Sequence, residues 1–138
     1  EGTLLGVPSI AISQVCTDGR PVKWATAETW VGRVLKRLTG EAWPKGVLMN
    51  VNLPDVTGRK VTGVEFTRQG QRKIGSDIAR GTDPRGEPYY WIGAQRTEEP
   101  HGKGSDLAAI GRGAISVTPL TMDLTHGPTL TRLRTDRR

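Results

Sequence analysis

The residues of this chain that could do chemistry rarely stand at spacings that chemistry requires. His101 and His126 each lack an acidic or sulfur-bearing neighbour at a metal-ligand spacing, so a zinc site is not expected. Both are expected at the surface or at a helix cap. The motifs GxGxxG, GxxxxGKS/T and GxSxG, which mark nucleotide loops and a nucleophile elbow, do not occur in the sequence.

Ser105 and Asp106 resemble a nucleophile beside a carboxylate. The sequence shows no residue that could act as a general base for Ser105. A Ser-Asp pair before an apolar run is also typical of a helix start, with serine as N-cap and aspartate in the first turn. We therefore predict a capping role for both residues. Asp83 and Arg85 are assigned to the turn "DPRG".

Basic residues are the other candidates, because the formal net charge is +6. Arg68, Arg72 and Lys73 follow an expected strand and could meet phosphate, although solvent exposure is the simpler interpretation. The ending "RLRTDRR" could contact nucleic acid. It also suits a solvated helix end, where arginine matches the negative pole of the helix dipole. We therefore do not expect nucleic acid as a partner.

Length and composition set the frame in which these residues are placed. The 138 residues include 18 glycines, 9 prolines and 35% hydrophobic residues, which indicates one compact domain of short elements and many turns. No apolar run is long enough for a membrane span. Cys16 is the single cysteine, which fits a reducing compartment and a cytoplasmic location.

The first 55 residues predict a strand, a helix and a second strand. Consecutive apolar residues Ile10 to Ile12 are typical of a strand buried on both faces, as in a covered parallel sheet. The helix is expected to start at Thr26 as its cap and to end at Gly40 in a left-handed conformation. Residues 45–55 form the second buried strand, which Pro54 stops. The helix has one apolar stripe, made of Ala27, Trp30, Val31, Val34, Leu35 and Leu38.

The remaining residues predict a long antiparallel segment over 61–93 that leaves the α/β unit, here called the excursion, and a closing unit after it. Residues 61–73 alternate as a strand with one solvated face. Tyr89, Tyr90 and Trp91 return as a strand that is aromatic on both faces, which raises the question of what covers the second face. A short helix, a strand over 114–118 and a last helix starting at Pro128 complete the chain.

Four segments, taken in order, resemble the survival protein E (SurE) family: "EGTLLGVPSIAIS", "GVLMNVNLPD" with "FTRQGQRK", "DPRGEPYYWIG" and "GSDLAAIGRGAISVTPLTMDLT". The resemblance covers essentially the whole chain. It implies an α/β fold, with this chain as the C-terminal part of a Rossmann-like three-layer sheet bearing a projecting antiparallel hairpin and a C-terminal helix. It also implies a metal-dependent phosphatase for nucleoside 5′- or 3′-monophosphates.

The resemblance also implies where the chemistry lies. Family members hold Mg²⁺ or Mn²⁺ with an Asp-Asp pair, a Ser and an Asn in the amino-terminal half, so we expect no catalytic and no metal residue in this chain. It begins at Glu1 rather than Met, and we expect the first half to be missing. The expected division is an α/β part over 1–58, an extended hairpin over 59–103 and a closing part over 104–138.

In this family the hairpin and the C-terminal helix reach neighbouring subunits. The resemblance therefore implies a homodimer or homotetramer and answers the question of the second aromatic face. The alternative from the residues is that the aromatic triplet folds back on its own core. For function, a nucleotidase and a non-catalytic assembly module both stay open. The expected interface residues are Tyr89, Tyr90, Trp91, Leu130 and Leu133.

Overall fold

The computed structural model describes residues 1–17, 19–71, 78–92 and 101–136. Within these residues, four strands form one sheet in the order β1-β2-β6-β3, and β4 pairs with β5 in a separate hairpin. The sheet strands are β1 Ser9–Gln14, β2 Val47–Leu53, β3 Val64–Phe66 and β6 Ile115–Thr121. The helices are α1 Trp24–Thr39, η1 Gly58–Lys60, α2 Asp106–Gly111 and α3 Gly127–Thr135.

The predicted strand–helix–strand unit is confirmed. β1 and β2 are parallel and in register from Ser9 opposite Leu48 to Gln14 opposite Leu53, and α1 connects them. The apolar stripe of α1 faces the sheet, where Val34 and Leu38 are buried. Burial of such a stripe against a sheet is what stabilises a helix of this kind.

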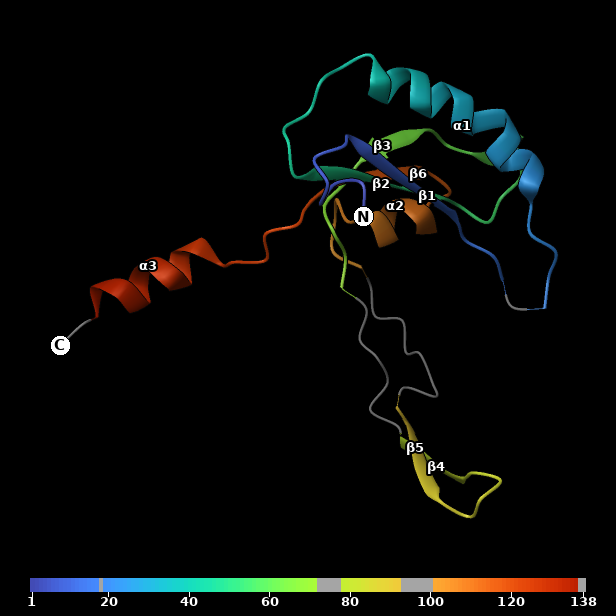
Figure 1. Ribbon diagram of the computed structural model, residues 1–138. Helices are drawn as coiled ribbons and strands as arrows, with labels where there is room; N and C mark the ends of the chain where they lie inside the picture. Colours follow the sequence, from blue (N-terminus) through green and yellow to red (C-terminus); the bar gives the residue numbers. More distant parts are fainter. Residues whose placement is uncertain (18, 72–77, 93–100, 137–138) are drawn as a thin grey trace.

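The core lies between α1 and one face of the sheet. Its buried members on the strands are Val51, Leu53, Ile115 and Val117. Figure 1 shows α1 on this face and α2 on the opposite face, which gives three layers. β6 runs antiparallel to β2 and parallel to β3, so the sheet is mixed. The expected α/β fold class is confirmed.

The predicted start of α1 was wrong, while its predicted end at Gly40 was right in position but not in backbone conformation. The helix begins at Trp24, with Lys23 at the N-cap position. Thr26 therefore lies inside the helix, fully buried, and its hydroxyl donates to the carbonyl oxygen of Val56 at 2.6 Å. This tertiary partner takes the hydroxyl that a cap would use. Gly40 is right-handed, with φ −73°, so it does not end the helix in the expected way.

Two strand predictions also need correction. β1 is an edge strand of the described sheet, and Ala11, Ile12 and Ser13 are exposed, whereas burial on both faces was expected. The strand expected over 61–73 is regular only at Val64–Phe66, because β6 offers a parallel partner over three residues alone. The last sheet strand is longer than the predicted 114–118.

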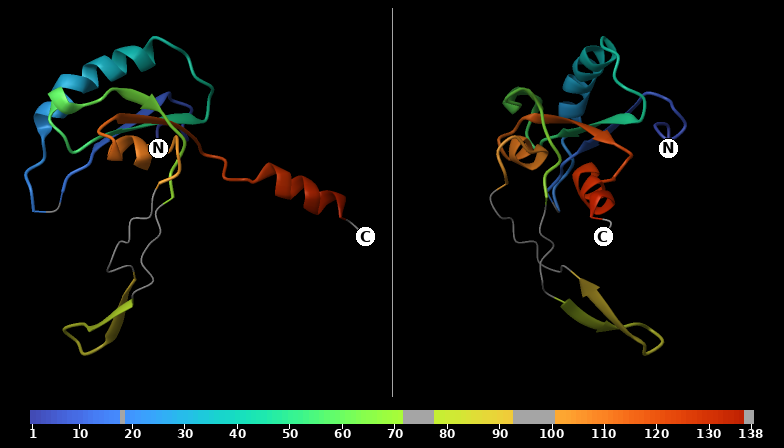
Figure 2. Two further views of the ribbon diagram at one scale, coloured as in Figure 1. Left: turned by 180° about the vertical axis from the view of Figure 1, so that it is seen from behind. Right: turned by 90° about the vertical axis from the view of Figure 1, so that its left-hand side faces the viewer.

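Two elements stand apart from the sheet. Figures 1 and 2 show the hairpin of β4 (Ile78–Thr82) and β5 (Pro88–Ile92) on one side and α3 on another. Residues 72–77 and 93–100 of the extended hairpin expected over 59–103 lie outside the described residues, and so do Arg72 and Lys73. In the described part of the chain, no helix has the length and apolar character to cross a membrane.

Candidate functional site

The two strands of the hairpin are joined by a turn, and Asp83 in this turn accepts its main hydrogen bonds. The Asp83 carboxylate accepts hydrogen bonds from the backbone amides of Arg85 and Glu87, both at 2.8 Å. Gly86 follows with φ 88°, a conformation in which a side chain would be strained. Asp83 and Arg85 therefore belong to the turn, as the sequence predicted.

The strand pairing of the hairpin sorts its aromatic residues onto two faces. Tyr90 lies opposite Arg80, while Tyr89 and Trp91 lie opposite Gly81 and Ala79. A Cβ at Gly81 would overlap the Tyr89 ring, so this ring rests on the bare backbone of β4. The small residues leave a shallow open hollow between the rings on this face.

Neither face of β5 is covered by the described residues. Tyr90 is 63% exposed and Trp91 64% exposed, and Tyr89 keeps 47% of its surface exposed although its ring lies on Gly81. Ile78 and Ile92, which pair with each other beside Tyr90, are exposed as well. Large exposed aromatic residues of this kind are typical of protein interfaces, and the predicted interface role of the triplet stays a prediction.

The C-terminal helix also exposes its apolar side. Leu130 is partly exposed and Leu133 is 62% exposed, so neither packs into a core within the described chain. Pro128 stands in the first turn, as predicted, and His126 occupies the N-cap position. The His126 Nδ1 atom lies 2.6 Å from the Thr129 hydroxyl, and its side chain makes no capping hydrogen bond to the backbone.

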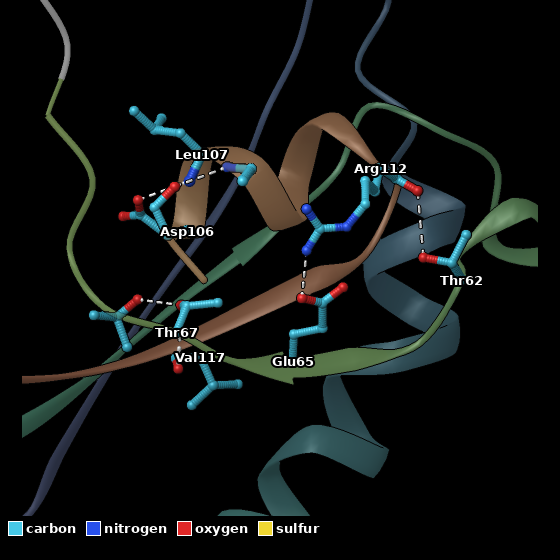
Figure 3. Close-up of polar contacts among 10 residues, drawn as sticks. Thr62, Glu65, Thr67, Asp106, Leu107, Arg112 and Val117 are labelled. Atoms are coloured by element: carbon cyan, nitrogen blue, oxygen red, sulfur yellow. Dashed lines mark hydrogen bonds and ion pairs between the residues drawn. The ribbon is translucent and has the colours of Figure 1, made fainter. Parts of the chain in front are cut away.

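Ser105 and Asp106 are confirmed as the start of α2. Asp106, shown beside Leu107 in Figure 3, also forms part of a clasp that closes the base of the projecting segment over 59–103. The Ser105 hydroxyl accepts from the Ala108 amide at 3.2 Å. The Asp106 carboxylate accepts from the Leu107 amide at 2.7 Å and from the Gly70 amide at 2.8 Å. The Asp106 amide in turn donates to the Arg68 carbonyl oxygen. The Asp106 carboxylate thus joins the segment that leads into the hairpin to the segment that follows it.

We predict that Asp106→Ala opens this clasp. The Gly70 and Leu107 amides, which are partly buried, would lose their acceptor, and each lost hydrogen bond is expected to cost about 0.5–1.5 kcal/mol. Amide hydrogen exchange at Gly70 should become faster, while the Ala109 amide inside α2 should change less. Asp106→Asn is the matched control, because it keeps a carbonyl oxygen at this place. Equal Gly70 protection in Asp106→Ala and the unaltered protein would contradict the clasp.

A second set of contacts joins β3 to α2 and β6 (Figure 3). The Arg112 guanidinium pairs with the Glu65 carboxylate at 2.7 Å. The Thr62 hydroxyl donates to the Arg112 carbonyl oxygen at 3.3 Å, and Thr67 shares a hydrogen bond with Thr118 at 2.7 Å. These contacts hold the strand that leads into the hairpin against the sheet.

A polar cluster that sequence reasoning missed lies at the carboxyl ends of β1 and β2. The Asp55 carboxylate pairs with the Lys23 ammonium group and accepts from the Thr17 hydroxyl. Hydrogen bonding to Lys23 and then to Thr17 lowers the pKa of Asp55 below its ordinary value. Ligands of α/β sheets bind at this edge, but both charges of the cluster already satisfy each other.

The described residues do not fit a metal centre. Among them, no three His, Cys, Asp or Glu side chains come together as a ligand set. The Asp106 and Asp55 carboxylates accept hydrogen bonds from this chain's own groups. No catalytic step through a metal is therefore assigned to this part of the chain.

The fold and its exposed elements define the class of protein first. It is a three-layer α/β unit that presents an aromatic hairpin and a helix with exposed leucines. The model of the family described as "Survival protein SurE" matches residues 1–76, which is more than half of the chain. The chain belongs to the survival protein SurE family.

Relatives and a solved structure agree with this assignment. The chain is 54% identical to the 5′-nucleotidase SurE of Paramagnetospirillum magneticum over 98% of its own length and 52% of the relative. It is 49% identical to that of Rhodospirillum rubrum, over 96% and 52%. The crystal structure of the SurE protein from Aquifex aeolicus superposes with a TM-score of 0.78 at 30% identity, over 97% of this chain and 53% of that one. The chain thus spans about half the length of these proteins.

Proposed function

We propose that this chain is part of a metal-dependent nucleotidase that hydrolyses nucleoside 5′- or 3′-monophosphates to nucleoside and phosphate. The observation that supports the proposal most is its 54% identity, over nearly its whole length, to a protein named 5′-nucleotidase SurE. The proposal places the protein in the cytoplasm. The dependence on Mg²⁺ or Mn²⁺ rests on the family resemblance, with the metal held outside this chain.

The role proposed for this chain is assembly. The hairpin residues Tyr89, Tyr90 and Trp91 and the α3 residues Leu130 and Leu133 would contact a second and, in a tetramer, a third copy. Their exposure supports this role, because contiguous exposed apolar surface is costly in a monomer. The proposed division of the chain is an α/β part over 1–58, a hairpin part over 59–103 and a closing part over 104–138.

A second candidate is an assembly module that does no chemistry. It is favoured by the same exposed hairpin faces, which need no catalytic group to explain them. The two candidates agree on the residues of the interface. They differ in whether phosphate is released.

Phosphate release separates these candidates. We expect a protein with the length of the curated relatives to release phosphate from 5′-AMP and p-nitrophenyl phosphate with Mn²⁺ or Mg²⁺. EDTA should reduce the release to background. The 138-residue chain alone, with its intact mass measured on the same sample, should release none.

Two outcomes would contradict this proposal. Failure of the longer protein to release phosphate with either metal would argue against a nucleotidase and leave the assembly module. Metal-dependent release by a confirmed 138-residue chain would place the catalytic residues within this chain after all.

A further inference from the structure

The segment over 56–66 runs alongside α1 for most of the helix. The Thr26 hydroxyl donates to the Val56 carbonyl oxygen, and the Trp30 indole N–H donates to the Gly58 carbonyl oxygen at 2.9 Å. Two turns further along the helix, Arg37 reaches Phe66. Figures 1 and 2 show the same arrangement, with η1 and β3 following α1. Helix and segment thus form one continuous seam on the surface.

Four cationic residues lie along this line of contact. Arg33 and Arg37 come from α1, and Arg59 and Lys60 come from η1; all four are exposed. We name this set the basic seam. The Arg33 guanidinium stands 5.4 Å from the Trp30 ring centre, and that of Arg37 stands 4.8 Å from the Phe66 ring centre. Stacking holds a guanidinium in place while its N–H groups stay free to donate.

The acidic residues around α1 do not neutralise the basic seam. At about 100° per residue, Glu28 is turned about 140° from Arg33 and about 180° from Arg37 around the helix. Glu41 lies beyond the end of α1, and among the described residues no ion pair joins Glu28 or Glu41 to the basic seam. Asp55 pairs with Lys23, and Glu65 pairs with Arg112. The seam therefore keeps a local positive charge that suits an anionic partner.

Phe66 indicates which anionic partner fits. Its side chain is 56% exposed beside the Arg37 guanidinium, so a further aromatic ring can stack on it. A line of cations with an exposed aromatic ring is the combination that recognises single strands, with phosphates on the cations and bases on the ring. We propose that the basic seam binds single-stranded nucleic acid.

The basic seam is a different surface from the arginine-rich C-terminal segment that the sequence analysis considered for nucleic-acid binding. Those C-terminal arginines were interpreted as a solvated helix end, and nucleic acid was not expected as a partner. The basic seam joins residues that lie more than twenty positions apart and that only the fold brings together. It is independent of the nucleotidase proposal, because binding needs neither the metal nor turnover.

Binding of a fluorescently labelled single-stranded 12-mer to the full chain tests the proposal, measured by anisotropy between 50 and 200 mM salt. With four phosphate contacts, the slope of log K against log salt is expected to be about −2.8. Arg33→Gln with Arg37→Gln should reduce it to about −1.4. Arg59→Gln with Lys60→Gln should do the same without altering α1. Phe66→Leu should weaken binding with a nearly unchanged slope, because it removes a stacking ring and no charge.

The matched control is Arg132→Gln with Arg134→Gln in α3, which removes the same charge at another place. This variant should leave both the affinity and the slope nearly unaltered. An equal loss in this control would assign the binding to the C-terminal helix and overturn the proposal. Equal competition by a poly-glutamate peptide would show a general anion surface and would also overturn it, as would binding that does not depend on salt.

Discussion

Replacing Tyr90 with alanine is expected to convert the assembled protein into smaller species. Tyr90 is the centre of one hairpin face, flanked by the paired Ile78 and Ile92, and all three are more than 60% exposed in the single chain. The few residues that dominate an interface cost about 2 kcal/mol or more when truncated, and they are enriched in tyrosine and lie near its centre. A loss of about 2 kcal/mol raises the dissociation constant roughly thirtyfold.

Sedimentation velocity over a range of protein concentrations would measure this change. Tyr90→Phe keeps the ring and should leave the assembly intact. Trp24→Ala removes an equally exposed aromatic residue, 65% exposed, from α1 and outside the expected interface, and should leave the mass unaltered. The interface role would be refuted by an unaltered mass in Tyr90→Ala. An equal dissociation in Trp24→Ala would show that the effect is not specific to the hairpin.

Local patterns predicted those elements whose partners are near in sequence. The turn at Asp83, the cap at Ser105 and the start of α3 at Pro128 were all found, because each depends on residues within one turn of the chain. The apolar runs of β1 and β2 and the apolar stripe of α1 likewise predicted the strand–helix–strand unit. The fold class and the family therefore followed from the sequence.

Features that depend on distant partners were not predictable in this way. Thr26 was taken for a cap because its acceptor, Val56, lies 30 residues away. The Gly70 amide meets the Asp106 carboxylate across 36 residues, and Asp55 meets Lys23 across 32. The apolar residues of β1 did not predict its exposure, because a strand lies at the edge of a sheet when no further strand pairs with it, and its own residues do not determine that. The basic seam was missed for the same reason.

The clasp and the hairpin belong to one argument about assembly. An arm that contacts another subunit must leave its own domain at a defined point, because freedom at its base adds an entropic cost to association. The Asp106 carboxylate and the Arg68 backbone supply this point, and the pair of Arg112 and Glu65 holds the preceding strand. The exposed residues of the hairpin would thus make the contacts with another subunit, and the hydrogen-bonded base would fix where the hairpin leaves its own domain.

Ile115 is one of the fully buried core residues, and Ile115→Ala is expected to lower the free energy of unfolding by about 2–5 kcal/mol. Its side chain is fully buried and belongs to the core cluster under α1 with Val34 and Val51. It stands on β6, the strand that pairs with β2 on one side and β3 on the other. A cavity here would weaken the packing of α1 on the sheet and the support of the central strand β6.

Urea unfolding followed by circular dichroism would measure this loss. Ile115→Val removes one methyl group from the same place and should cost about 0.5–1.5 kcal/mol. Ile12→Ala makes the same change as Ile115→Ala on the edge strand β1, where the side chain is 40% exposed, and should cost clearly less. An Ile115→Ala variant within about 0.5 kcal/mol of the unaltered protein, with an unchanged denaturant slope, would mean that this core does not hold the sheet together. The expected order of the three variants follows from how much buried apolar surface each substitution removes and from the size of the cavity that it leaves.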